Sequence, residues 1–392
     1  MPGRPPISAG SETERTAGRP PDNDDIGMPP DDAVPLFVDL DGTLVRTDVT
    51  TEAAFDLIRS NLGYAVLLAV WVLRGTAFLK RQVAARTTPV AETLPYIETF
   101  VDYLRQQRAA GRPLVLTTAA DQSVADSVAA HLGLFDRAIG SDGVTDLGGK
   151  NKLNRIREMV GDGAFDYAGD DLADLWIFSK AREAIVVNPA APVRAFAARA
   201  ANVKRIFEPE ARHFSDFFQA MRPARWPMNL LVFLPLAFSG QVFDASSWIA
   251  ALLGLLSFCL AASASYVFDD LLHLPARRTL PAAERGPIAG GRIALQRAGW
   301  ALPVLWGVAF VVALALSAAF AATLAAFIVL CVLAAQDRWR LPRLPVAMAL
   351  SALRAVGGVL LVAAPVLGWS LAVGLAAGAA VELSRRAKSG FI

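Results

Sequence analysis

The feature that most constrains the fold of this 392-residue chain is a series of long apolar segments in its second half. They begin near Met228, carry few charges, and raise the hydrophobic fraction of the whole chain to 54% and its mean hydropathy to +0.40. Segments of this length and composition are typical of helices that cross a lipid bilayer. We expect about six of them, at residues 227–243, 248–268, 301–317, 318–335, 344–363 and 366–381.

Basic residues are distributed unevenly between the linkers that join these segments. The linkers after the second and fourth segments, and the stretch after the sixth, carry arginine or lysine, whereas the turn Asp244–Ser247 carries neither. Because arginine and lysine concentrate in cytoplasmic loops, this pattern predicts that the basic linkers and both termini face the cytoplasm. The N-terminus has no apolar core of the signal-peptide type, so we expect the first half of the chain to be cytoplasmic too.

The first half of the chain divides into a polar tail and an α/β region. Residues 1–33 are rich in Pro, Gly, Asp and Ser, which predicts a disordered tail. Residues 34–205 alternate strand and helix patterns, which favours a parallel, doubly wound α/β sheet. We expect strands at Leu36–Asp39, Pro113–Thr117, Phe165–Ala168 and Ala184–Val187.

The stretch between the first two strands, residues 45–112, is too long for a simple crossover and predicts an inserted helical cap. Within it, Leu62–Leu73 is twelve apolar residues, which is too short to span a bilayer. Four basic residues follow between residues 74 and 86. This helix is either buried in the cap or rests on an anionic membrane surface, and the sequence leaves both interpretations open. Residues 206–226 then form a linker at the membrane interface.

Polar residues follow three of the expected strands. Asp39-Leu40-Asp41-Gly42-Thr43-Leu44 begins where the first strand ends, and Thr118 and Asp170 follow two others. Because ligands bind at the carboxyl ends of the strands in such sheets, we expect these side chains to lie close together. Two carboxylates two residues apart, followed by Gly-Thr, predict a site for phosphoryl transfer to aspartate.

In these residues the first half resembles the haloacid dehalogenase (HAD) superfamily of phosphohydrolases. Asp39–Leu44 corresponds to its first motif, Thr118 to the second, Lys152 to the third and Gly169–Asp174 to the fourth. The resemblance implies that Asp39 is the nucleophile and forms an aspartyl-phosphate. Thr117 and Lys150 stay open as alternatives to Thr118 and Lys152.

The resemblance also assigns the remaining roles at this site. Asp41 would protonate the leaving oxygen and then activate water. Thr118 and Lys152 would bind the phosphoryl oxygens. Mg²⁺ would be held by Asp39, by the backbone carbonyl of Asp41 and by Asp170, with Asp174 supporting the metal shell.

From residue 222 onward, four runs resemble the UbiA family of membrane prenyltransferases. They are Arg222–Phe233, Tyr266–Leu272, Arg285–Gly291 and Leu353–Gly358. The branch that transfers phosphoribose to polyprenyl phosphate is the most similar, and bacterial UbiA proteins are found fused to a HAD-like domain of this kind. The resemblance implies a bacterial-type cytoplasmic (inner) membrane and a multi-pass, UbiA-like domain cut short at about six helices. It assigns lipid or phosphate binding to Arg222, Asn229, Asp270, Arg285 and Arg354.

The carboxylate signature of that family is largely altered here. The four positions of the signature Asn-Asp-x-x-Asp-x-x-x-Asp, whose carboxylates bind Mg²⁺, are here Asp269, Asp270, His273 and Arg277, so a cation stands where the family has a metal ligand. Ordinary metal-dependent prenyl transfer is therefore not favoured. We expect instead a solvated basic loop, including Arg278, that touches lipid phosphates.

Three functions follow from these patterns. The first is a membrane-anchored, Mg²⁺-dependent HAD phosphatase that acts on a lipid- or prenyl-linked phosphate, such as polyprenyl-phospho-ribose 5-phosphate. The second is a bifunctional transferase and phosphatase that makes a lipid-linked pentose donor. The third is a catalytically inactive, lipid-binding scaffold. The expected partners are polyprenyl phosphate or a lipid-linked phosphate and membrane lipids, and no nucleic acid.

Overall fold

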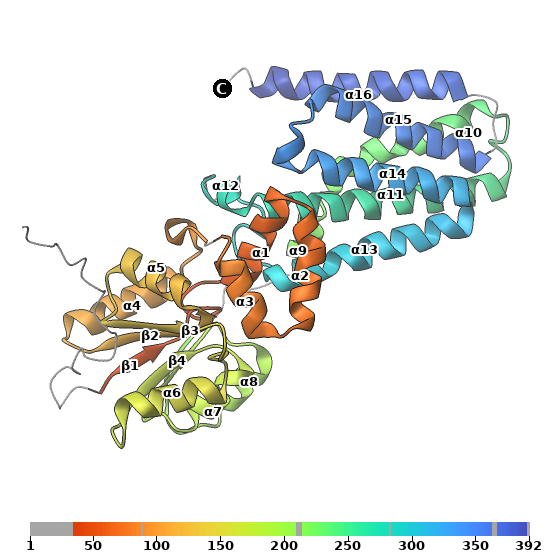
Figure 1. The fold of residues 1–392 in the computed structure, drawn as a ribbon. Coiled ribbons are helices and arrows are strands. Elements are labelled where there is room, and N and C mark those ends of the chain that lie inside the picture. The colour runs from red at the N-terminus through yellow and green to blue at the C-terminus, as the bar shows by residue number, and fades with distance from the viewer. Residues whose placement is uncertain (1–33, 88, 209–213, 282–283, 363–366, 390–392) are drawn as a thin grey trace, which may run out of the picture. The chain divides into compact units, whose positions relative to one another are not determined.

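A six-stranded parallel sheet forms the centre of the first half of the chain, as expected (Figure 1). The computed structural model describes residues 34–87, 89–208, 214–281, 284–362 and 367–389, so the expected disordered tail lies outside the described residues. The strand order is β3-β2-β1-β4-β5-β6. The strands are β1 (Leu36–Val38), β2 (Leu114–Asp121), β3 (Arg137–Ser141), β4 (Asp166–Gly169), β5 (Ala184–Val187) and β6 (Val203–Phe207).

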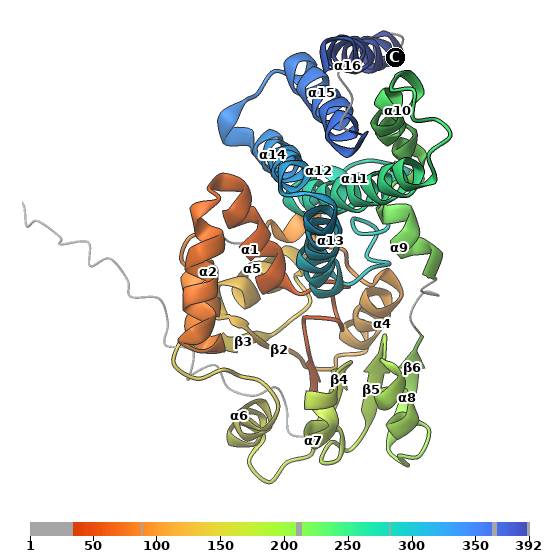
Figure 2. The ribbon, with the colours of Figure 1, turned by 90° about the vertical axis from the view of Figure 1, so that its right-hand side faces the viewer.

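Alternating side chains of β1 build a core on each face of this sheet. Leu36 and Val38 pack with apolar residues of α4 (Glu98–Ala109) and α5 (Gln122–Leu132). Phe37 points the other way. It packs with the helices on the second face, which are α6 (Lys150–Val160), α7 (Leu175–Phe178) and α8 (Ala191–Ala197). The region is therefore a three-layer α/β fold, with helices on both faces of the sheet (Figure 2).

The helices inserted between β1 and β2 form the cap. They are α1 (Val49–Ser60), α2 (Gly63–Leu73), α3 (Thr76–Ala84) and the 3₁₀ turn η1 (Ala91–Thr93). A small apolar cluster joins α1, α2 and α3 through Ala53, Leu57, Trp71 and Val83. Of the residues expected in the cap, those of α4 instead pack on the sheet.

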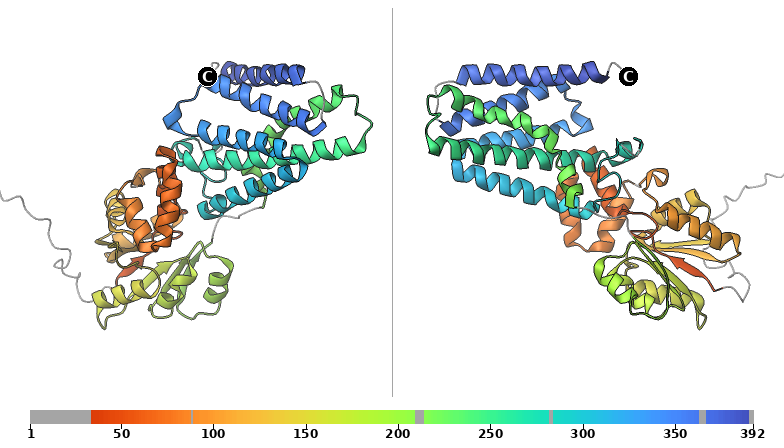
Figure 3. Two further views of the ribbon diagram at one scale, coloured as in Figure 1. Left: turned by 45° about the vertical axis from the view of Figure 1, so that its right-hand side comes forward. Right: turned by 180° about the vertical axis from the view of Figure 1, so that it is seen from behind.

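The region after β6 is helical. Its elements are α9 (Phe214–Ala220), η3 (Pro223–Phe233), α10 (Leu234–Phe238), α11 (Ala245–Leu272), α12 (Leu274–Arg278), α13 (Leu295–Leu316), α14 (Ala318–Ala334), η5 (Asp337–Trp339), α15 (Arg343–Val362) and α16 (Leu367–Ser389). β6 itself reaches Phe207, so a strand occupies the start of the expected linker. Helices α15 and α16 lie side by side in both views of Figure 3.

Among the described residues, three helices are long and apolar enough to cross a membrane: α11, α13 and α15. They correspond to three of the six expected segments. Two others, α14 and the part of α16 from Gly368 to Ser384, are apolar but shorter. Residues 227–243 do not form one helix: the 3₁₀ helix η3 runs to Phe233, and the five-residue helix α10 follows, with Pro235 in its first turn.

Candidate active site

The carboxyl edge of the sheet brings the expected site residues of the first half together. Val38 is aligned with Leu116 of β2 and with Ala168 of β4, so the residues that follow each of them lie at the same level. The N–H of Asp39 donates to the carbonyl of Ala168 at 3.0 Å, which continues the strand pairing by one residue. Asp39 therefore lies directly after the end of β1, beside the loop that carries Asp170.

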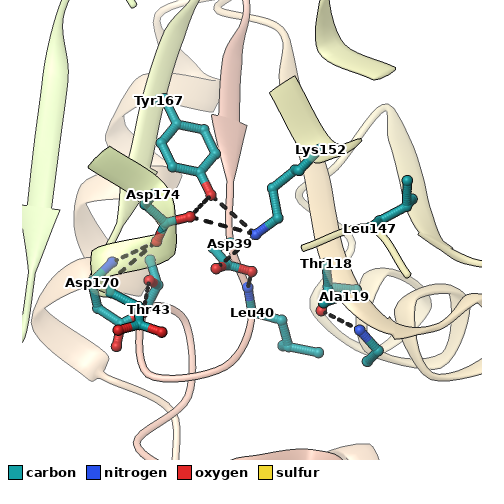
Figure 4. A network of polar contacts seen from close by, with 12 residues as sticks. Asp39, Leu40, Thr43, Thr118, Ala119, Leu147, Lys152, Tyr167, Asp170 and Asp174 are labelled. Carbon is teal, nitrogen blue, oxygen red and sulfur yellow. Dashed lines mark hydrogen bonds and ion pairs between the residues drawn. The ribbon is translucent and has the colours of Figure 1, made fainter. Parts of the chain in front are cut away.

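Lys152 makes a polar network with three side chains from β1, β4 and the turn after β4 (Figure 4). Its Nζ lies 2.8 Å from Asp39 Oδ2 and 3.8 Å from Asp174 Oδ1. It also donates to the hydroxyl of Tyr167 at 3.1 Å, and that hydroxyl donates to Asp174 Oδ1 at 2.7 Å. Lys152 is 3% exposed, so this charge is held inside the site and directed at the expected nucleophile.

The electrostatics of the network favour a charged lysine. Burial lowers the pKa of Lys152, but the nearby charges of Asp39 and Asp174 outweigh it and the pKa is raised. Burial raises the pKa of Asp39 to about 6, although Lys152 acts in the opposite direction. The site therefore favours a charged lysine beside a carboxylate that burial makes costly to ionise.

Three carboxylates are close enough to share one cation. One oxygen each of Asp39, Asp170 and Asp174 lies within 4.8 Å of the others. Burial, and then the charges of the other two carboxylates, raise the pKa of Asp170 well above its usual value. A divalent ion would relieve this repulsion, and an all-oxygen ligand set suits Mg²⁺. These residues fit the magnesium site that the sequence predicts.

The turn that carries Asp41 requires a glycine. Gly42 has φ +78°, and a Cβ at this position would lie 2.0 Å from Asp170 Oδ2. Thr43 then donates its hydroxyl to Asp170 Oδ1 at 3.0 Å. The Gly-Thr pair of the first motif thus lets the loop after β1 approach Asp170 closely and holds one of its oxygens.

Asp41 lies outside the carboxylate cluster and faces the cap. Its Oδ1 accepts a hydrogen bond of 2.8 Å from the N–H of Val49, the first residue of α1. Burial, followed by the charge of Asp48, raises the pKa of Asp41 well above its usual value. A carboxyl group whose pKa is raised by burial suits the role of general acid.

The structure separates the two candidate lysines. Lys150 stands over the ring of Trp176 at 4.4 Å and is exposed, whereas Lys152 contacts Asp39. The two threonines are both fully buried. The Thr118 hydroxyl accepts from the N–H of Ala120 at 3.0 Å, and the Thr117 hydroxyl has no hydrogen-bond partner. The assignment of Thr118 stays a prediction.

Tyr167 is a site residue that sequence reasoning missed. It lies on β4, two residues before Gly169, so its side chain projects to the same face of the sheet as that position. Its side chain is apolar except for the hydroxyl, and its ring packs in the core with its centre 5.6 Å from that of Phe178. A polar-tipped aromatic two residues before the Gly-Asp motif was the available signal.

The five expected lipid- or phosphate-binding residues fall into two groups. Arg222 and Asp270 form an ion pair, and together with Arg285 they line one cavity. Asn229 and Arg354 form the second group, in which Arg354 Nε donates to Asn229 Oδ1 at 2.7 Å. Arg354 thus has a neutral partner.

The expectation of a solvated basic cluster at the end of α11 is wrong for two residues. Asp270 is 6% exposed and Arg278 is 8% exposed. Arg222 covers Asp270, and the guanidinium of Arg278 donates to both carboxylate oxygens of Glu52, at 2.6 and 2.9 Å. These partners lie far away in the sequence, so local composition did not reveal them.

Comparison with known proteins agrees with this geometry. Residues 36–179 match the family model of haloacid dehalogenase-like hydrolases. Together with the parallel sheet and the aspartate cluster, this match supports a HAD-like hydrolase domain in the first half of the chain. The UbiA resemblance of the second half is not shown by these comparisons and stays a prediction.

A protein of Sinorhizobium fredii, described as uncharacterized protein y4nM, is 34% identical over 302 residues. The match covers 76% of this chain and 58% of that relative, so the chain spans less than two thirds of the relative's length. Among solved structures, a protein of unknown function from Bordetella pertussis Tohama I is 20% identical, with a TM-score of 0.38 over 45% of this chain and 98% of that one. A phosphoserine phosphatase in its apo form is 15% identical, with a TM-score of 0.33 over 45% of this chain and 94% of that one.

Proposed function

We propose that this protein is a membrane-anchored, Mg²⁺-dependent phosphatase that works through an aspartyl-phosphate on a lipid- or prenyl-linked phosphate. The observation that carries the proposal is the contact of 2.8 Å between Lys152 and Asp39, at the edge of a three-aspartate cluster. A buried carboxylate beside a buried ammonium group is suited to attack an anionic phosphate, because the lysine offsets the repulsion.

The residues divide the reaction into two displacements. A carboxylate oxygen of Asp39 attacks the phosphorus, the bond to the leaving oxygen breaks, and Asp41 gives that oxygen its proton. Asp41 then takes a proton from a water whose oxygen attacks the aspartyl-phosphate, which releases inorganic phosphate and restores Asp39. Lys152 and Thr118 bind the phosphoryl oxygens throughout. The raised pKa of Asp41 supports its starting as an acid.

The carboxylates of Asp39, Asp170 and Asp174 and the backbone carbonyl of Asp41 would hold Mg²⁺. When bound, the ion supplies positive charge that lets an anionic nucleophile meet an anionic phosphate. Tyr167 holds Asp174 in place, because its hydroxyl donates a hydrogen bond to Oδ1 of that carboxylate. The backbone N–H groups of Asp170 and Asp171 donate to Oδ2 of the same carboxylate, each at 3.2 Å.

Two features support a substrate carried by a lipid. Three apolar helices follow the hydrolase domain in the same chain, and two of them, α11 and α13, contact the cap helix α1, whose Phe55 and Ile58 pack against their cluster of apolar side chains. The choice of a polyprenyl-linked pentose phosphate rests on the UbiA resemblance alone. On the same basis we propose a bacterial-type cytoplasmic membrane, and the basic linkers between the apolar segments support a hydrolase domain on its cytoplasmic side.

The test is a phosphatase screen of the full chain in detergent with Mg²⁺, using lipid-linked phosphosugars and soluble phosphomonoesters. Asp39→Asn should reduce phosphate release from every substrate by roughly 1,000-fold or more. Lys150→Ala is the matched control, because Lys150 is exposed and makes no contact with Asp39. Unchanged turnover in Asp39→Asn would refute the phosphatase. A kcat/KM for lipid-linked substrates no higher than for soluble ones would refute the lipid substrate.

A further inference from the structure

A cavity of about 630 Å³ lies at the end of α11, between α9, the start of η3, α12 and the turn before α13. Four arginines and two carboxylates are the charged side chains that line it. They are Arg222, Arg225, Arg277, Arg285, Asp270 and Glu284. The cavity therefore carries an excess of positive charge, and it is separate from the aspartate cluster of the hydrolase domain.

The carboxylates beside this cavity are already bound by arginine. Asp270 forms an ion pair with Arg222, and its Oδ1 also lies 3.2 Å from Nε of Arg277. Asp269 is 2.6 Å from Arg277 Nη2 and 3.2 Å from the Nδ1 of His273. The UbiA resemblance implies a magnesium site at these two aspartates. The side chains do not fit one, because a divalent ion there would meet guanidinium groups where it needs open oxygen ligands.

The arginines are held by more than their ion pairs. The guanidinium groups of Arg222 and Arg225 stand 5.7 and 5.1 Å from the ring centre of Tyr266. Arg285 Nε donates to the carbonyl of Leu280 at 2.8 Å, which ties it to the preceding turn. Side chains fixed in this way lose little freedom when they bind a ligand, and a guanidinium fork matches the oxygens of a phosphate.

We propose that this cavity binds a phosphate group directly through its arginines, without a divalent metal. The ligand class is a phosphate ester or free phosphate, carried either by a lipid headgroup or by a soluble molecule. In this arrangement Arg277 supplies the positive charge that a metal would supply, and Asp269 and Asp270 orient the arginines. The proposal does not depend on the phosphatase activity of the hydrolase domain.

The experiment measures binding by calorimetry to the full chain in detergent, in the Asp39→Asn background, so that turnover cannot consume the probe. The probes are geranyl phosphate and inorganic phosphate, each with EDTA and with Mg²⁺. We expect binding in EDTA that Arg225→Gln and Arg277→Gln each weaken by about tenfold, in line with the loss of a charged hydrogen bond. Arg297→Gln, in an exposed arginine of α13 outside the cavity, should bind as the parent protein does.

Thermal unfolding of each variant shows whether it has folded. If Arg277→Gln does not fold, the binding test relies on Arg225→Gln. Tighter binding of geranyl phosphate would assign the phosphate to a lipid, and equal binding of both probes would assign it to a soluble ligand. Binding that disappears in EDTA would overturn the proposal. So would equal weakening by Arg297→Gln and the cavity variants.

Discussion

Lys152 and Lys150 differ by two positions in α6, and the helix separates their roles. Lys152 lies on the same face as Ile156 and Val160, which are buried against the sheet, whereas Lys150 faces solvent beside Trp176. The 3.6-residue repeat of the helix explains why only one of them reaches Asp39. Burial also explains the network, since a buried ammonium group needs paired acceptors.

Lys152→Ala should lower kcat by about 100- to 1,000-fold, because the phosphoryl group and the nucleophile both lose their fixed positive charge. Lys150→Ala, the same substitution one half-turn away, should leave kcat unchanged. Steady-state kinetics on one soluble phosphomonoester would measure both variants. A similar loss in the two variants would show that Lys152 has no special part in the reaction.

Tyr167 acts through Asp174, so we regard it as a positioning residue. Tyr167→Phe keeps the ring packed against Phe178 but removes the hydroxyl that donates to Asp174. The Mg²⁺ concentration needed for half-maximal activity should rise by about 10- to 100-fold, as is typical when the support of a metal ligand is lost. The melting temperature should change little. A magnesium requirement equal to that of the parent would assign Tyr167 a packing role alone.

At the scale of elements, the expectation that α2 is a buried cap helix holds for Trp71 alone, and most of the helix is exposed. Trp71 is buried with Ala53 and Leu57 of α1, as expected of a cap helix. The other side exposes Val66, Val70 and Leu73, at 69%, 42% and 87%. A helix that is apolar on all sides and packed on only one presents a surface suited to a lipid interface.

We therefore predict that α2 touches lipid when the full chain is in a bilayer. Val70→Cys, labelled with an environment-sensitive fluorophore in a variant without Cys259 and Cys331, should be quenched by spin-labelled lipids in nanodiscs. Glu158→Cys, at an exposed position of α6, is the control and should not be quenched. Quenching at neither position, or equal quenching at both, would contradict the prediction that α2 in particular touches lipid.

At the scale of the whole molecule, one buried ion pair joins the hydrolase domain to the apolar helices. Glu52 of α1 and Arg278 of α12 have side chains that are 5% and 7% exposed, and two hydrogen bonds connect them. Gln296 of α13 also donates to Asp48, the N-cap of α1, at 3.0 Å. The cap helix next to Asp41 is thus fixed to α12, which follows α11, and to the start of α13.

Removing either partner of this pair leaves a buried charge alone. Glu52→Gln and Arg278→Gln should each destabilise the protein by about 3–5 kcal/mol. The double variant should lose less than the sum of the two, because no uncompensated charge remains. Glu158→Gln breaks an exposed pair with Arg155 and should change stability by less than about 1 kcal/mol. Thermal unfolding in detergent would measure all four, and additive single effects would argue against the coupling.

The sequence predicted the sheet well, because strands leave local signals. The expected strand Ala184–Val187 coincides with β5, and the other three expected strands overlap β1, β2 and β4. The strands β3 and β6 were missed, since their polar and basic residues give no apolar run. The expectation of about six spanning segments followed hydropathy alone, which could not show that the first segment is divided between η3 and α10, at Pro235.

By itself, the sequence determined the parallel α/β architecture, the apolar helices, and the position of the candidate nucleophile at the end of the first strand. Each of these depends on residues close together in the chain, where periodicity and motif spacing act. Only the tertiary structure decided that Lys152 rather than Lys150 reaches Asp39, that Tyr167 donates a hydrogen bond to Asp174, and that Arg222 and Arg277 pair with Asp270. These contacts join distant segments, and their partners are chosen by which side chains burial brings together.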